Sequence, residues 1–247
     1  MGLNRFLGLI RSFRLYYGSL GKRRQMDRFY AQFVRRGALC FDIGSHVGNR
    51  IGCWRRLGAR VVAVEPQPDC VRFLRWAYGG DSAVTIDPRA VGRRDKRVRM
   101  LISSRTPTVS SLSPEWIDEV RKDPRFSRVN WDRTIDVEMV TLDRLIVRYG
   151  EPSFCKIDVE GLETDVLSGL SRPLPALSFE YIPVAISRAL ACIDLLSGLG
   201  AYVYQYSEAE SMCWRSSRWM RAEEMKAVLE SLPFHSASGD VYARLGG

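Results

Sequence analysis

A glycine-containing turn follows the first apolar run of the sequence, and an acid stands at its start. Asp42, Gly44 and Gly48 form the pattern D-x-G-x-x-x-G, with Ser45 and His46 between the glycines. Glycine in a turn between a strand and a helix lets the backbone approach a ligand closely. The pattern predicts a ligand site, although any tight strand-to-helix turn also favours glycine.

A second acid, Glu65, ends the next apolar run, twenty-three residues after Asp42, and Pro66 follows it. A carboxylate in this place can bind the two hydroxyls of a ribose. A dinucleotide would bring its pyrophosphate to the turn, where Asp42 opposes a negative charge, and the usual G-x-G-x-x-G spacing is missing. S-adenosylmethionine has no phosphate and carries an ammonium and a sulfonium. The sign of the charge favours S-adenosylmethionine as the cofactor, with a nicotinamide-dependent oxidoreductase as an alternative.

A third group of charges lies in the segment K-I-D-V-E-G-L-E, which begins at Lys156. Lys156 and Asp158 are two apart in a predicted strand, so they face the same side. Charges near the end of a buried strand need partners or a ligand. One interpretation is an ion pair of Lys156 with Glu163 or Asp143 that fixes the loop. The other is a catalytic site that includes Lys156, Asp158 and Glu160.

Alternating apolar runs and helical segments predict the elements that position these residues. Short continuous apolar runs separated by helices are typical of a parallel sheet that is covered on both faces. We expect a doubly wound α/β domain over residues 37–247, with a mostly parallel sheet of seven strands. In such a sheet, ligands bind at the carboxyl ends of the strands, where the acids described above lie. The seven runs are 38–42, 60–65, 83–86, 154–159, 176–180, 202–206 and 241–245.

Residues 1–36 form a basic arm that carries +8 of the net charge of +9. Its apolar residues recur at steps of three and four, which predicts amphipathic helices. One interpretation places these helices on an edge of the core, and the other on an anionic membrane surface as a peripheral anchor. Because so little charge remains outside the arm, a nucleic-acid surface spread over the whole domain is not indicated.

The cellular location is predicted from the absence of membrane-spanning, secretory and disulfide patterns in the sequence. No apolar run approaches the eighteen residues that a membrane-spanning helix needs, and the start of the sequence does not resemble a secretory signal. The six cysteines form no C-x-x-C pair and no compact disulfide framework. We expect a cytoplasmic protein, peripheral to the inner face of the membrane if the arm binds lipid.

Residues 103–136 interrupt the alternation of strands and helices. A stretch of this length inside a compact domain usually forms a lid or a binding loop. At its centre, residues 114–120 predict a short helix with Ser113 as the N-cap. We expect the insertion to cover the ligand crevice, with Trp116, Trp131 and Arg105 as residues that could face an acceptor. A disordered surface excursion is the alternative.

Five motifs in this order resemble the FkbM family of methyltransferases. They are F-D-I-G at 41–44, V-E-P at 64–66, A-V-G at 90–92, V-T-L-D at 140–143 and K-I-D-V-E-G at 156–161. The resemblance covers about residues 38–182, and the last motif is the most specific. It implies a class I methyltransferase (Rossmann-like) fold, S-adenosylmethionine as the donor and transfer to a hydroxyl oxygen of a small molecule, natural product, glycan or lipid. The cofactor residues that it implies are Asp42, Gly44, Ser45, His46, Gly48, Glu65, Pro66, Ala90 and Asp158. The family commonly has Ala-Asn where this chain has Ser45 and His46.

The implied reaction needs a group that removes the proton of an alcohol. The two histidines are poor candidates, because His46 belongs to the turn and His235 to an apparent surface loop. We expect Asp158 to border the donor methyl and orient the acceptor, and Glu160 or a desolvated Lys156 to accept the proton. Carboxylates this close could instead hold a divalent cation.

Two further alternatives remain open. In the first, the chain is a non-catalytic nucleoside-binding protein, or one that binds a membrane or nucleic acid through its basic arm. In the second, it methylates a nitrogen. The N-P-P-Y or D-P-P-Y element of amino methyltransferases is absent, since D-V-E-G stands in its place from Asp158.

Overall fold

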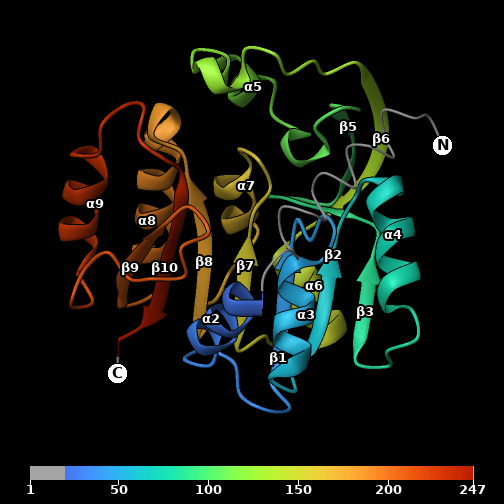
Figure 1. The fold of residues 1–247 in the computed structure, drawn as a ribbon, viewed down its shortest axis with the longest axis horizontal. Coiled ribbons are helices and arrows are strands. Elements are labelled where there is room, and N and C mark those ends of the chain that lie inside the picture. Colours follow the sequence, from blue (N-terminus) through green and yellow to red (C-terminus); the bar gives the residue numbers. More distant parts are fainter. Residues whose placement is uncertain (1–19, 247) are drawn as a thin grey trace.

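The computed structural model describes residues 20–246, and seven strands of this part form one twisted sheet (Figure 1). The strand order is β3-β2-β1-β7-β8-β10-β9. β10 runs antiparallel to both of its neighbours, and the pairs from β3 to β8 are parallel. The predicted doubly wound α/β fold with a mostly parallel seven-stranded sheet is confirmed. The strands are β1 (Leu39–Ile43), β2 (Arg60–Val64), β3 (Val84–Asp87), β7 (Phe154–Ile157), β8 (Ala176–Tyr181), β9 (Tyr202–Glu208) and β10 (Gly239–Leu245).

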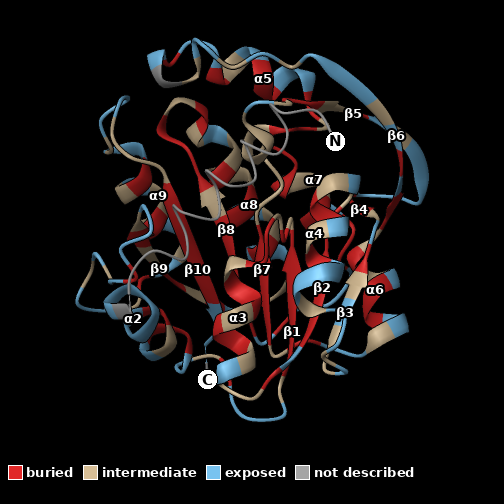
Figure 2. Ribbon diagram, turned by 45° about the vertical axis from the view of Figure 1, so that its right-hand side comes forward, coloured by how far each residue is buried: buried red, intermediate tan, exposed pale blue. Residues whose placement is uncertain are grey.

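Helices cover both faces of this sheet because its strands are apolar on both sides. Successive residues of a strand point to opposite faces, so Phe41 packs in one core with Leu145 and Ile193, and Cys40 packs in the other with Trp54. The strands in the middle of the sheet are buried along their length (Figure 2). One face carries α2 (Leu20–Tyr30), α3 (Asn49–Arg56) and α4 (Pro68–Tyr78). The other carries α6 (Leu142–Tyr149), α7 (Glu163–Ser168), α8 (Ile186–Leu199) and α9 (Ala222–Glu230).

The described part of the basic arm packs on the core. Phe29 and Tyr30 of α2 are buried, and the Tyr30 ring lies edge-on to Trp54 at 5.6 Å between centroids. Phe29 contacts Trp214 of the loop after β9 at 4.4 Å. Residues 1–19, which hold most of the apolar stripe predicted for a membrane anchor, lie outside the described residues. None of the described helices is long and apolar enough to cross a bilayer.

A second, three-stranded sheet leans over the carboxyl ends of the large one (Figure 1). The insertion runs between β5 and β6, which pair antiparallel, and it is folded rather than a surface excursion. Ser113 Oγ accepts the backbone N–H of Trp116 at 3.1 Å, so the predicted helix and its cap are confirmed. The elements of this region are β4 (Ala90–Val91), β5 (Lys96–Ile102), α5 (Pro114–Val120) and β6 (Arg133–Val140), with single 3-10 turns at Pro107–Val109, Pro124–Phe126 and, before α8, Pro183–Ala185.

Candidate active site

A pocket opens at the carboxyl ends of β1 and β7, where the strand order of the large sheet reverses. It holds about 870 Å³ of space, including open solvent at its mouth. The insertion supplies part of the wall through Thr108, Ser110 and Leu112. Ten of the predicted site residues line the pocket: Asp42, Gly44, Ser45, His46, Glu65, Pro66, Ala90, Lys156, Asp158 and Glu160. The eleventh, Gly48, lies outside the lining.

The two glycines of the turn are required by contacts within the protein. Gly44 has φ +84°, and a Cβ there would lie 1.8 Å from the carbonyl oxygen of Asp158. Gly48 has φ +77° at the start of α3, and a Cβ there would lie 2.8 Å from the Tyr78 ring. The sequence suggested that these glycines admit a ligand. In the structure they allow the turn to pack against the backbone of the loop after β7 and against the Tyr78 ring of α4.

Replacement of Gly44 by alanine is therefore expected to destabilise the protein by about 2 to 3 kcal/mol, because the methyl group meets backbone on a residue held at positive φ. Urea unfolding measures the effect. Gly80→Ala is the matched control, because no heavy atom lies within 4 Å of a Cβ at Gly80, and its change should stay below about 1 kcal/mol. Equal stability of the two variants would contradict the contact with Asp158.

The turn that lines this pocket carries buried polar atoms without partners. Asp42 is 3% exposed, and among the described residues neither its Oδ2 nor the two ring nitrogens of His46 have a hydrogen-bond partner. Burial raises the pKa of Asp42 to about 6 and lowers the pKa of His46 to about 4, so the imidazole is neutral at pH 7. Ser45 Oγ is engaged within the turn, where it donates to the carbonyl oxygen of Asp42 at 2.7 Å. The unpartnered Asp42 oxygen fits a cationic ligand group.

Glu65 is held rigidly at the end of β2. One carboxylate oxygen accepts the backbone N–H of His46 and the other that of Gln67, both at 2.8 Å. Burial raises the pKa of Glu65 to about 7. A carboxylate oxygen has two lone pairs, so each oxygen can still accept a hydroxyl from a ribose in the pocket.

Lys156 lies between two carboxylates at the centre of the sheet. Its Nζ donates to Asp158 Oδ2 at 2.9 Å and to Asp240 Oδ1 at 3.0 Å. Burial alone would lower the pKa of Lys156, but the two carboxylates raise it well above its ordinary value. The expectation of a neutral, desolvated Lys156 as the proton acceptor is therefore wrong. An ion pair is present, but its partners differ from the predicted Glu163 and Asp143.

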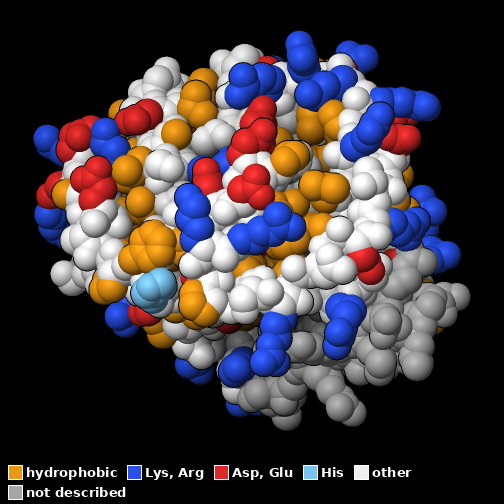
Figure 3. All heavy atoms as spheres, turned by 90° about the horizontal axis from the view of Figure 1, so that it is seen from above, with side chains coloured by type: hydrophobic (Ala, Val, Ile, Leu, Met, Phe, Trp, Pro, Cys, Tyr) orange, Lys and Arg blue, Asp and Glu red, His pale blue; other side chains and the backbone are white. Residues whose placement is uncertain are grey.

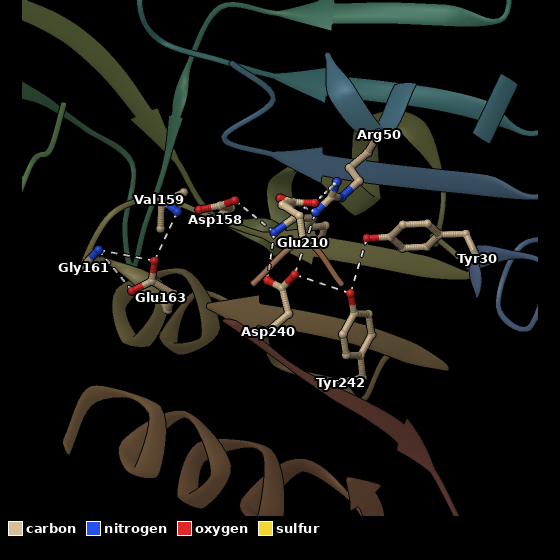
Figure 4. Close-up of polar contacts among 10 residues, drawn as sticks. Tyr30, Arg50, Asp158, Val159, Gly161, Glu163, Glu210, Asp240 and Tyr242 are labelled. Carbon is tan, nitrogen blue, oxygen red and sulfur yellow. Dashed lines mark hydrogen bonds and ion pairs between the residues drawn. The ribbon is translucent and has the colours of Figure 1, made fainter. Parts of the chain in front are cut away.

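The network extends to residues that the sequence analysis missed (Figure 4). Arg50 of α3 is buried and donates to both carboxylate oxygens of Glu210, at 2.9 and 3.0 Å, and both residues line the pocket. Its guanidinium also lies 3.9 Å from Asp240, which accepts the hydroxyl of Tyr242 at 3.4 Å. Arg50 is two residues beyond the turn motif, in the helix that the sequence predicts there. No pattern in the sequence indicated Glu210, in the loop after β9.

Three carboxylates meet beside this network. Asp158, Glu160 and Glu180 each offer an oxygen, and these oxygens lie within 4.8 Å of one another. Burial and the charge of Asp158 raise the pKa of Glu160 well above its ordinary value, and burial and Glu160 do the same to Glu180. Burial alone would raise the pKa of Asp158, but Lys156 holds it below the usual range. Asp158 is thus the charged member, and Glu160 is the more basic carboxyl of the two that line the pocket.

The turn that carries Glu160 has an unusual backbone. Glu160 has φ +53° and Gly161 φ +95°. Glu163 supports the turn by accepting the backbone N–H groups of Val159 and Gly161, both at 3.1 Å (Figure 4). A non-glycine residue at positive φ costs free energy and marks many functional sites. Here the conformation directs Glu160 into the pocket lining.

The insertion rests on this turn. Ser111 Oγ donates to the carbonyl oxygen of Glu160 at 2.6 Å, and Arg188 of α8 joins Glu119 of α5 to the carbonyl oxygen of Gly161. Trp116 is 1% exposed and packs so closely on Gly161 that a Cβ there would lie 2.2 Å from its ring. The expectation that Trp116 could face an acceptor is wrong, because the ring is used to dock the insertion.

The strand order and the pocket at the reversal point are those of a class I methyltransferase fold. Residues 42–189, which are 148 of the 247 residues, match the methyltransferase FkbM domain. The chain belongs to this family, as its motifs predicted.

Solved structures similar to this chain include two that are described as O-methyltransferases. One, from Bacillus cereus in complex with SAH, has a TM-score of 0.49 at 10% identity, over 98% of this chain and 89% of that one. The other, a putative O-methyltransferase from Klebsiella pneumoniae, has a TM-score of 0.48 at 8% identity, over 93% of this chain and 81% of that one. A comparison with curated proteins found no match.

Proposed function

We propose that the protein transfers a methyl group from S-adenosylmethionine to a hydroxyl oxygen of a small molecule, natural product, glycan or lipid. The observation that carries this proposal is the buried, unpartnered oxygen of Asp42 in a pocket of negative charge. The lining holds five acids and three basic side chains, so with His46 neutral its charge reaches −2 when all five acids are ionised. Such a lining favours a ligand with ammonium and sulfonium groups and disfavours a pyrophosphate.

Each residue of the site has a role in this reaction. Asp42 would bind the ammonium group and Glu65 the ribose hydroxyls, and bound S-adenosylmethionine supplies an electrophilic methyl group. Lys156 fixes the carboxylate of Asp158, which orients the acceptor. Glu160 accepts the hydroxyl proton, for which its raised pKa suits it. Most of the acceleration comes from alignment of the acceptor oxygen with the methyl group and from exclusion of water.

The proposal is tested with S-adenosylmethionine that carries a labelled methyl group, incubated with the protein and a fractionated cell extract. A labelled product in which mass analysis finds the methyl group on oxygen supports it, and a product labelled on nitrogen or carbon contradicts it. Calorimetric titration with NAD and with S-adenosylmethionine separates the oxidoreductase, which binds NAD in preference. A non-catalytic binder takes up S-adenosylmethionine in the titration but gives no labelled product in the assay.

Asp42→Asn is expected to weaken S-adenosylmethionine binding by about tenfold at neutral pH, because the ligand loses one charge partner of about 1.4 kcal/mol. The pKa of Asp42 is about 6. The carboxyl is charged above that pH and attracts the cation, and it is protonated below it. Affinity of the parent protein should therefore fall from about pH 7.5 to about pH 5, and that of the variant should fall less. Calorimetry at several pH values measures both.

The control is Asp118→Asn, which removes a charge from α5 at a side chain that is 74% exposed and outside the pocket lining. It should leave the affinity and its pH dependence unchanged. If Asp42→Asn binds S-adenosylmethionine as tightly as the control, the role of Asp42 is refuted.

In a variant of this mechanism, Asp158, Glu160 and Glu180 would hold a divalent cation, which would supply Lewis-acid activation of the acceptor hydroxyl. In that variant EDTA abolishes turnover and added Mg²⁺ restores it. Proton transfer to Glu160 without a cation predicts full turnover in EDTA. The same labelled assay distinguishes the two.

A further inference from the structure

A second hollow adjoins the candidate active site under the three-stranded sheet. It lies between the turn that joins β4 to β5 and the start of α7, and holds about 860 Å³, including open solvent. Its floor is apolar, with Met139 and Leu162, and its rim carries Arg93, Arg94 and Lys96. We call it the basic groove. Figure 3 shows the molecule from above the view of Figure 1, and on this face Lys and Arg side chains lie around acidic ones, with apolar side chains between them.

Two of the three basic side chains of the basic groove have no ion-pair partner among residues 20–246. Arg93 pairs with Asp165 at 2.9 Å. No carboxylate of residues 20–246 lies within ion-pair distance of Arg94 or Lys96, and both are exposed. With Arg93 and Asp165 cancelling, Arg94 and Lys96 leave a charge of +2 along the rim.

The opposite face of β5 shows the contrast. Arg97 is in register with Glu138 of β6 and Arg99 with Asp136, so an acid occupies the paired backbone position of each cation, although none of residues 20–246 forms an ion pair with either arginine. Lys96 stands opposite Met139. It points to the same side as Val98, since alternate residues share a face, and that side is the apolar cluster. An unmatched cation over an apolar floor favours an amphipathic anion.

The basic groove and the candidate active site share one wall. Leu112 of the insertion lines both hollows. The active-site pocket is also lined by Val159 and by Glu160, the proposed proton acceptor. The basic groove is lined by Leu162, two residues further along the chain. A molecule seated on the groove floor therefore lies next to the methyl-transfer site, on the other side of Leu112.

We propose that the basic groove binds an anionic group, a phosphate or a carboxylate, of an amphipathic methyl acceptor. This inference rests on the proposed function in one respect, namely that the bound molecule is the methyl acceptor. The binding of an anion in the basic groove does not depend on the proposed function. Arg94 and Lys96 hold the anion, Met139 and Leu162 contact its apolar part, and the hydroxyl to be methylated lies towards Glu160.

Calorimetric titration with octyl phosphate tests the binding, with octyl glucoside as the neutral probe of equal chain length and octanoate to separate phosphate from carboxylate. The double variant Arg94→Gln/Lys96→Gln should bind the preferred anion at least about tenfold more weakly than the parent. The matched control, Arg97→Gln/Arg99→Gln, removes two charges from the other face of the same strand and should bind like the parent. Equal weakening in both double variants, or equal binding of octyl glucoside, overturns the proposal.

The labelled product of the methyl-transfer assay gives the second test. We expect an anion-exchange resin to retain the labelled product at neutral pH. We also expect less of this product from Arg94→Gln/Lys96→Gln than from the parent, and an unchanged amount from the control. A neutral labelled product overturns the role of the groove and leaves methyl transfer standing. Absence of any labelled product counts against the proposed function alone, because the titration still decides whether the groove binds anions.

Discussion

Replacement of Lys156 by methionine is expected to lower the free energy of unfolding by about 3 to 5 kcal/mol. The ammonium group lies 2.9 Å from Asp158 and 3.0 Å from Asp240, and Lys156 is 4% exposed. Its removal leaves Asp240, itself 6% exposed, with Arg50 at 3.9 Å as its nearest charge partner. The loss arises from uncompensated charge in the core more than from the ion pair itself. Chemical unfolding of the parent and the variant measures it.

A double variant tests that explanation. Lys156→Met/Asp240→Asn removes the stranded charge as well as the ammonium, so it should recover at least about half of the lost stability. Lys226→Met is the control at the surface, where Lys226 pairs with Asp194, and it should change stability little. A double variant that is less stable than Lys156→Met would refute the explanation.

Glu160→Gln is expected to lower turnover by about 10² to 10⁴ while S-adenosylmethionine binding persists, since a neutral amide cannot accept the acceptor's proton. Burial and the charges of Asp158 and Glu163 raise the pKa of Glu160 well above that of an ordinary carboxyl. The group accepts a proton only when it is ionised, so turnover of the parent should rise with pH, with a midpoint above the usual carboxyl range. The variant should lack this rise. Rates across pH, with calorimetry of donor binding, measure both.

Glu138→Gln, on the outer face of β6 opposite Arg97, provides the comparison and should keep the parent rate and pH profile. Parent-like turnover in Glu160→Gln would remove Glu160 from the reaction. In that case the raised pKa would reflect only crowding of three carboxylates.

The sequence predicted the sheet and the strand ends because those signals are local. Apolar runs of four to six residues mark the central strands, and Asp42, Glu65 and Asp158 each stand at or just beyond a run. In a parallel sheet the carboxyl ends share one edge, so these acids had to converge.

The partners of Lys156 could not be predicted in the same way. Asp240 is 84 residues away and reaches Lys156 because β10 inserts between β8 and β9. No local pattern encodes that strand order, since it depends on how distant segments pack. Glu210 was missed for a related reason, because its loop crosses to Arg50 of α3 from the far edge of the sheet.

The insertion contacts the turn at Glu160 and Gly161. This contact limits how the substrate range of the protein can be re-engineered. Ser111 and Trp116 both belong to the insertion, yet Ser111 binds the carbonyl oxygen of Glu160, the proposed proton acceptor, and Trp116 packs on the adjacent Gly161. A chimera that grafts the corresponding segment of a relative onto this scaffold would need to keep these two side chains. Without them, a graft intended to alter selectivity would also misplace Glu160, and the loss of rate would be mistaken for poor recognition.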